Sequence, residues 1–135
     1  MNKFFGRWNS YEGMAEDWFS SYDHFNVETE KYEKEPLPKD FPKEKDILIA
    51  TYGGGSYEGD AFVLFKQRGK LFEVNGSHCS CYGLEGQWKP EETTVAALKM
   101  KGKKEASSSY YFLYEHDHDA YTAYWTLVEK LKEKP

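Results

Sequence analysis

The fold is decided by residues 47–74, which read ILIATYGGGSYEGDAFVLFKQRGKLFEV. The segment opens with Ile47–Tyr52, an apolar run rich in branched side chains that is typical of a buried strand. A second apolar run, Ala61–Phe65, is followed by the turn residues Gln67–Lys70 and then by Leu71–Val74. This order predicts a hairpin beside the first strand, and therefore an antiparallel sheet at the centre of the chain.

Helical periodicity occurs on both sides of this segment. Near the N-terminus, apolar and aromatic residues recur at intervals of three and four: Trp8, Tyr11, Ala15, Trp18 and Tyr22. Near the C-terminus the same spacing links Ala120, Tyr121, Tyr124, Trp125, Val128 and Leu131. Each set forms one stripe of a helix, and Ser10 is placed to cap the first helix. We therefore predict two terminal helices that cover the sheet with their apolar faces.

The segments between these elements are assigned from their composition. Between Glu28 and Asp46, twelve of nineteen residues are charged and three are proline, which predicts a solvated connector. Asn75 and Gly76 form a second turn signal after the hairpin. Pro90 is suited to the first turn of a further helix, which would end near Gly102. Residues 110–114, YYFLY, are the candidate fourth strand.

These elements predict an α+β protein with a small antiparallel sheet of about four strands, covered by N-terminal and C-terminal helices. A chain of 135 residues suits one domain, because it buries about two thirds of its unfolded surface. We divide it into an aromatic helix over 1–27, a charged connector over 28–46 and an α+β core over 47–135.

Composition narrows the class of protein. The net charge of −5 disfavours broad attraction to nucleic acid phosphates. No apolar run approaches the roughly 18 residues of a membrane span, and Met1–Gly6 lack the pattern of a signal peptide. The expectation is a cytoplasmic protein with reduced cysteines and no membrane association.

Two cysteines and two histidines form the most unusual chemical feature of the sequence. Cys79 and Cys81 alternate on one short segment, and His116 and His118 alternate on another. Alternate residues of an extended backbone project to the same side, so each pair could supply half of a tetrahedral zinc site. The plainer interpretation is that the cysteines are small buried residues and the histidines are exposed residues before a helix. No other cofactor is indicated.

Other chemical interpretations rest on weaker patterns. Cys79 or Cys81 beside a histidine would resemble a nucleophile and its base, but no oxyanion element or orienting residue accompanies them. Gly53–Gly55 could cradle an anion, yet no helix and no Gly-Lys-Ser pattern follow. The lysines of 99–104 are typical of a solvated helix end. Whether the chain is an enzyme stays open, with a binding protein favoured.

Aromatic residues give the strongest indication of a binding role. Eleven Tyr, nine Phe and four Trp exceed what a small core usually needs, and aromatic side chains commonly anchor protein interfaces. The N-terminal stripe supplies the candidate partner-binding residues Trp8, Tyr11, Trp18 and Tyr22. The same stripe could instead pack on the sheet of its own chain, and we favour that packing because an exposed aromatic helix promotes aggregation.

The central block of the chain also carries a family resemblance. Residues 57–59, 61–65 and 69–74 and the run GSHCSCYGLEGQW at 76–88 resemble a family of small phage and bacterial proteins without an established activity. The resemblance implies a shared domain, and a phage setting would favour proteins that bind host machinery, including inhibitors of defence systems. The expected function is therefore noncatalytic binding of a protein partner through the acidic N-terminal third; the alternative is a zinc-binding domain.

Overall fold

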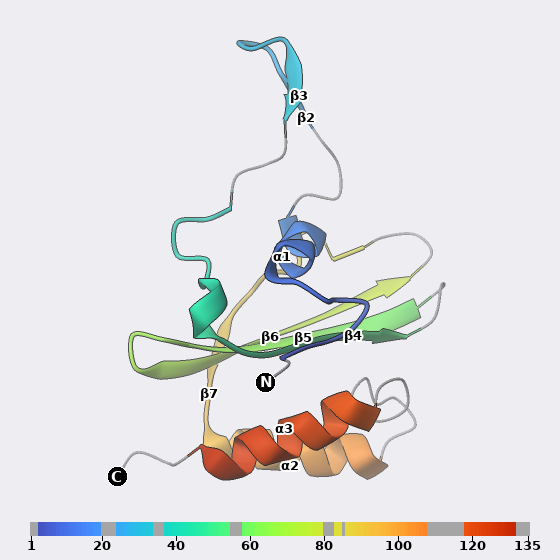
Figure 1. The fold of residues 1–135 in the computed structure, drawn as a ribbon, viewed down its shortest axis with the longest axis vertical. Helices are drawn as coiled ribbons and strands as arrows, with labels where there is room; N and C mark the ends of the chain where they lie inside the picture. The colour runs from blue at the N-terminus through green and yellow to red at the C-terminus, as the bar shows by residue number, and fades with distance from the viewer. Residues whose placement is uncertain are drawn as a thin grey trace.

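A five-stranded sheet lies at the centre of the molecule, with helices on both faces (Figure 1). The computed structural model describes residues 3–19, 24–33, 37–54, 58–79, 83–84, 86–107 and 118–131. The sheet has the strand order β1-β4-β5-β6-β7, with the bounds β1 Phe4–Gly6, β4 Ile47–Gly54, β5 Glu58–Gln67, β6 Lys70–Cys79 and β7 Glu91–Thr93. The helices are α1 Tyr11–Phe19, α2 Val95–Ser107 and α3 His118–Lys130, with a 3₁₀ turn, η1, at Glu44–Asp46. The expected α+β class is confirmed.

The central hairpin agrees with the prediction. β4 pairs antiparallel with β5, and β5 pairs antiparallel with β6 along its whole length. Arg68 and Gly69 connect β5 to β6 with φ angles of 52° and 74°. Two consecutive left-handed residues are typical of the two-residue turn whose twist matches that of the flanking strands.

The sheet has five strands and is mixed, whereas about four antiparallel strands were expected. β1 lies beside β4 and runs parallel to it, with Phe4 opposite Ala50. Three residues are too few to show a strand periodicity, so β1 left no signal in the sequence. The predicted strand at residues 110–114 falls outside the described residues.

β7 occupies the position where a helix was expected to begin. Glu91 and Glu92 pair with β6, and α2 starts at Val95. The hydroxyl of Thr94 accepts a hydrogen bond of 3.1 Å from the backbone N–H of Ala97, which caps the helix there. α2 also continues through Gly102, where its end was expected, because a glycine inside a helix costs only about 1 kcal/mol.

Asn75 and Gly76 lie within β6 and do not form the expected turn. A Cβ atom at Gly76 would lie 2.7 Å from Cη2 and 2.8 Å from Cζ3 of the Trp18 ring. The absence of a side chain therefore lets the indole lie directly against the strand. Tertiary packing overrides the local turn signal at this position.

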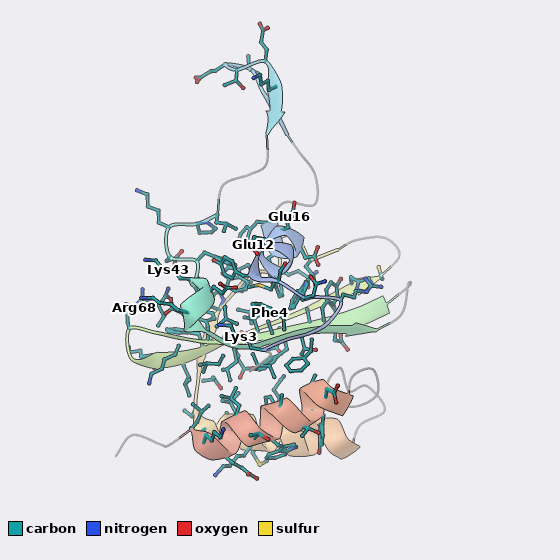
Figure 2. The ribbon with its side chains drawn as sticks, viewed as in Figure 1. Lys3, Phe4, Glu12, Glu16, Lys43 and Arg68 are labelled. Carbon is teal, nitrogen blue, oxygen red and sulfur yellow. The ribbon has the colours of Figure 1, made fainter. Side chains whose placement is uncertain are left out.

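The sheet separates two hydrophobic clusters. The first faces α1 and includes Trp8, Trp18, Val63 and Phe65, while the second faces α2 and α3 and includes Phe62 and Tyr124. Side chains fill both spaces between the sheet and its helices (Figure 2). At the start of α1 the hydroxyl of Ser10 accepts a hydrogen bond of 3.1 Å from the backbone N–H of Gly13, so its predicted role as a helix cap is confirmed.

A small hairpin interrupts the segment that was expected to be a connector. β2, His24–Asn26, pairs antiparallel with β3, Lys31–Glu33, with Phe25 opposite Tyr32. The turn residues Val27–Glu30 are exposed, and Glu30 has a left-handed φ of 56°. In Figure 1 the hairpin, drawn in light blue, projects away from the central sheet.

Candidate functional site

A buried tyrosine and a buried histidine share a hydrogen bond on the α1 side of the sheet. The hydroxyl of Tyr52, on β4, lies 2.7 Å from Nδ1 of His78, on β6. The two side chains are 5% and 8% exposed. Gly59, on the intervening strand β5, is paired directly with His78. A Cβ atom at Gly59 would lie 2.7 Å from Cε1 of the imidazole, so this glycine provides the space that the ring occupies.

Aromatic and cationic groups cover this pair. The Trp8 ring centroid lies 5.1 Å from that of Tyr52. The guanidinium of Arg7 lies 5.2 Å from the Tyr52 ring centroid, and the backbone N–H of Arg7 donates to the Tyr52 carbonyl at 2.9 Å. A tyrosine and histidine in contact are a possible proton-transfer pair. Here both are enclosed by packed side chains, so the geometry supports a hydrogen bond within the core more than a reactive site.

Cys79 and His78 are not placed to act as a nucleophile and its base, which is one form of the weaker catalytic interpretation. The two residues are adjacent on a regular strand, and adjacent strand residues project to opposite faces of the sheet. His78 lies on the face of α1 with Val74, whereas Cys79 lies on the face of Leu71, which packs against the cluster under α2 and α3. The sheet therefore separates the thiol from the imidazole.

The four predicted zinc ligands are only partly covered by the structure. Cys79 is half-buried at the end of β6, and His118 is the first residue of α3, although only its backbone is described. Cys81 and His116 lie outside the described residues. Among the residues that the structure does describe, no three His, Cys, Asp or Glu side chains gather into a metal-binding group. The zinc site stays a prediction.

The aromatic stripe packs against the sheet of its own chain. Trp8 and Trp18 are 2% and 0% exposed, and their ring centroids lie 6.1 Å apart within the first cluster. The Trp8 indole N–H donates to Oδ2 of Asp17 at 2.8 Å. Tyr22 lies outside the described residues. The two indoles are therefore parts of the core, where a protein partner cannot reach them.

Tyr11, a further residue of the stripe, lies at the edge of this core and also makes a polar contact. Its hydroxyl donates a hydrogen bond of 2.7 Å to the carbonyl of Pro42. Burial raises the pKa of the Tyr11 hydroxyl, and the nearby carboxylates of Glu12, Glu44 and Asp46 raise it further. Tyr11 thus joins α1 to the segment that precedes β4, and its half-buried ring contributes to packing more than to a free surface.

The GSHCSCYGLEGQW run has structural roles at the positions that are described. Gly76 makes room for Trp18, and Leu84 packs into the same cluster. The side-chain amide of Gln87 accepts from the backbone N–H of Ser77 at 3.0 Å and donates to the Ser77 carbonyl at 2.7 Å. The Gln87 side chain therefore makes the hydrogen bonds to β6 that a neighbouring strand would make, at a part of β6 that β7 does not reach. At its described positions, this motif is explained by packing and by hydrogen bonds to the backbone.

The glycine-rich and basic candidates show no anion-binding geometry at the positions that the structure describes. Gly55 and the side chains of Lys103 and Lys104 are not among them. Gly53 and Gly54 are part of β4 and pair with Asp60 and Gly59, so they do not form a loop around a phosphate. The ammonium of Lys101 donates to Oδ1 of Asn75 at 2.9 Å and lies 5.1 Å from the Phe62 ring centroid. This lysine therefore supports the packing of α2 on the sheet.

The exposed hairpin is the feature that the sequence interpretation missed. Val27, at its tip, is 79% exposed, which is the largest value among the exposed large apolar side chains of the described residues. The signal available in the sequence was the aromatic pair Phe25 and Tyr32 placed symmetrically about the turn. The high charge of the surrounding segment concealed it.

No family model, curated protein or solved structure matches the chain. None of the helices in the described ranges is long and apolar enough to cross a membrane.

Proposed function

We propose that this chain is a noncatalytic binding protein and that the β2–β3 hairpin is the part that engages a protein partner. The observation that carries the proposal is the projection of this hairpin from the central sheet, with Val27 79% exposed at its tip (Figure 1). An exposed apolar side chain on a projecting element is suited to enter a depression on another protein.

The length of the hairpin supports this role. Each strand has only three residues, and the side chains of the turn Val27–Glu30 and of the adjoining Lys31 are all exposed. By itself, a two-stranded hairpin is at best marginally stable in water. Contact with a partner would bury the tip and add the stabilisation that the hairpin lacks by itself.

Charge favours a basic surface on the partner. Glu28 and Glu30 lie beside Val27 at the tip, with Lys31 as the neighbouring cation. The first 46 residues contain eleven acidic and seven basic residues, whereas residues 89–135 contain eight of each. Opposite charge on the partner would accelerate association, and salt would slow it. The resemblance to phage proteins makes a host complex, such as a defence system, the partner class that we propose.

A quantitative capture experiment tests this function. The full chain is compared with V27S/E28K/E30K and with the control M100S/E91K/E129K, which removes an exposed apolar side chain and two exposed carboxylates elsewhere. We expect the wild-type chain and the control to recover the same protein from the native host, and the tip variant to recover about tenfold less of it. A tenfold loss corresponds to about 1.4 kcal/mol, a size expected when an important contact residue of an interface is replaced. Equal recovery with all three chains would contradict the proposal.

A further inference from the structure

A groove opens at the turn end of the sheet, between the β5–β6 hairpin and the helices α2 and α3. The groove is open to solvent on one side and has a volume of about 880 Å³. This volume lies within the range of about 300 to 1,000 Å³ that is typical of pockets for small molecules. The groove belongs neither to the Tyr52–His78 pair nor to the projecting hairpin.

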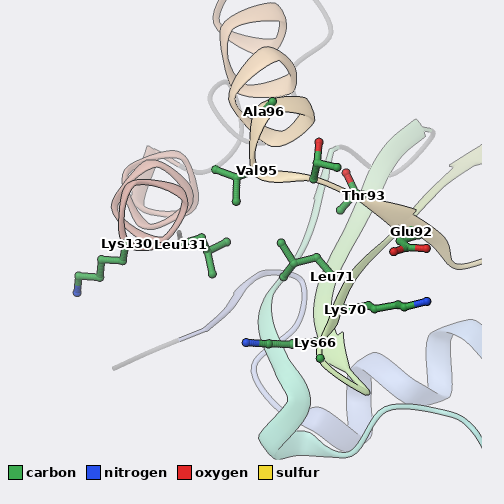
Figure 3. A pocket seen from close by; sticks show the side chains of 11 residues that line it. Lys66, Lys70, Leu71, Glu92, Thr93, Val95, Ala96, Lys130 and Leu131 are labelled. Carbon is green, nitrogen blue, oxygen red and sulfur yellow. The ribbon is translucent and has the colours of Figure 1, made fainter. Parts of the chain in front are cut away.

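The floor of the groove is apolar and continues the second hydrophobic cluster. Leu71, Val95 and Leu131 point into the same space in Figure 3. Val95 is a buried member of the cluster, while Leu71 and Leu131 are partly buried residues packed against it. An aliphatic chain placed here would extend an existing core and lose contact with water.

The rim of the groove is positively charged. Its lining contains Lys66, Lys70 and Lys130 and a single carboxylate, that of Glu92. Among the described residues, no carboxylate forms an ion pair with any of these lysines. In Figure 3, Lys70 and Glu92 extend to one side of the apolar floor, while Lys66 and Lys130 extend to the other. The excess positive charge is therefore on the side of Lys66 and Lys130.

The N-terminus of α2 lies at this groove, but the Thr94 hydroxyl already caps it, so the helix end adds little to the binding of an anion. What distinguishes the groove is an apolar floor beside two ammonium groups on a chain whose net charge is −5. We propose that it binds a small amphipathic anion, a monocarboxylate with a straight aliphatic tail. The tail would lie on Leu71, Val95 and Leu131, and the carboxylate would lie toward Lys66 and Lys130. This inference is independent of the proposed function and goes beyond it.

Titration of the ¹⁵N-labelled chain with sodium carboxylates of four to ten carbons, below micelle formation, tests the ligand class. We expect saturable shifts of the amides of Leu71, Val95 and Leu131. Affinity should rise by about fourfold for each methylene until the floor is covered, as expected for burial of CH₂ groups. The alcohol of equal length and inorganic phosphate should each bind more weakly by about tenfold, because each lacks one of the two interactions.

Variants test the position. Ala96 lines the groove and is exposed, and Ala97 is exposed but does not line it. A96W should abolish the carboxylate-induced shifts, whereas A97W should preserve them. K66E/K130E should weaken binding by about tenfold relative to the exposed-lysine control K45E/K99E, a size suited to two surface charge interactions.

Several results would overturn the inference. These are the absence of saturable shifts with the eight-carbon and ten-carbon acids, shifts that are spread over the surface, and equal affinity for the acid and the alcohol. An equal effect of A96W and A97W would also exclude this groove as the binding site. The spectra themselves report whether each variant is folded, so loss of binding is distinguished from loss of structure.

Discussion

Replacing Gly76 by alanine tests the packing that places α1 on the sheet. The new Cβ would lie 2.7 Å from Cη2 of Trp18 and 3.2 Å from a methyl carbon of Leu84. To regain the 3.4 Å at which ordinary van der Waals contact begins, the indole must move by about 0.7 Å. Trp18 is 0% exposed and is surrounded by other rings, including Trp88 at 5.2 Å, so it has little room to move.

We therefore expect Gly76→Ala to lower the free energy of unfolding by about 1 to 3 kcal/mol, the usual cost of overpacking a core. If Gly76 had no packing role and were only an unfavourable residue within a strand, alanine would instead raise the free energy of unfolding by about 0.5 to 1 kcal/mol. Urea unfolding followed by far-UV circular dichroism gives the difference directly.

The same substitution in a Trp18→Phe background provides the control. Phenylalanine lacks the outer ring atoms Cζ3 and Cη2 of the indole, so the cost of Gly76→Ala should fall to near zero. The two substitutions are then coupled in a double-mutant cycle. A stabilising Gly76→Ala, or a cost that is the same in both backgrounds, would refute this explanation of why β6 continues through a turn signal.

Three further predictions concern the edge of β6, the alkaline limit of stability and the metal. Gln87→Ala should cost about 1 to 3 kcal/mol, because two hydrogen bonds to Ser77 are lost, and it should accelerate hydrogen exchange at the Ser77 amide; an unchanged exchange rate would contradict this. The pKa of Tyr11 is raised in the folded protein, so its contribution to stability is complete below the ordinary pKa of 10.0 and is lost as pH rises through the folded-state pKa. Between these two pKa values, Tyr11→Phe should lose less stability than wild type. Equal losses of unfolding free energy in the two proteins over this pH range would contradict this. If Cys79 belongs to a zinc site, protein purified without a histidine tag or chelator should contain about one equivalent of zinc, and its removal should lower Tm; a content far below one equivalent would exclude the site.

The long apolar elements could be predicted from the sequence because their patterns are local. Residues 47–52, 61–65 and 71–74 all lie in strands. The aromatic stripe also packs on its own sheet, as favoured, because burial of large rings dominates the stability of such a helix. Two of the errors occurred at short elements: β1 and β7 have three residues each, which is too short for a period of two to be recognised.

The candidate site was less predictable because it depends on register. Tyr52 meets His78 only because Gly59 lies between them on β5, and no local pattern encodes that alignment of three strands. The projecting hairpin was missed for a different reason. Its pairing of Phe25 with Tyr32 is a short-range signal, but the charge of the segment indicated a solvated connector. High charge excludes a core, and it does not exclude a hairpin.

Photocrosslinking from the hairpin tip tests the central claim most directly. A photoreactive phenylalanine analogue is placed at position 27 in one chain and at position 100 in another, since Val27 and Met100 are the two most exposed large apolar residues among those described. Irradiation in an extract of the native host should give one discrete adduct from position 27 that decreases as the salt concentration of the extract is raised, and no adduct of that mass from position 100. The same adduct from both positions, or none from position 27, would contradict the account.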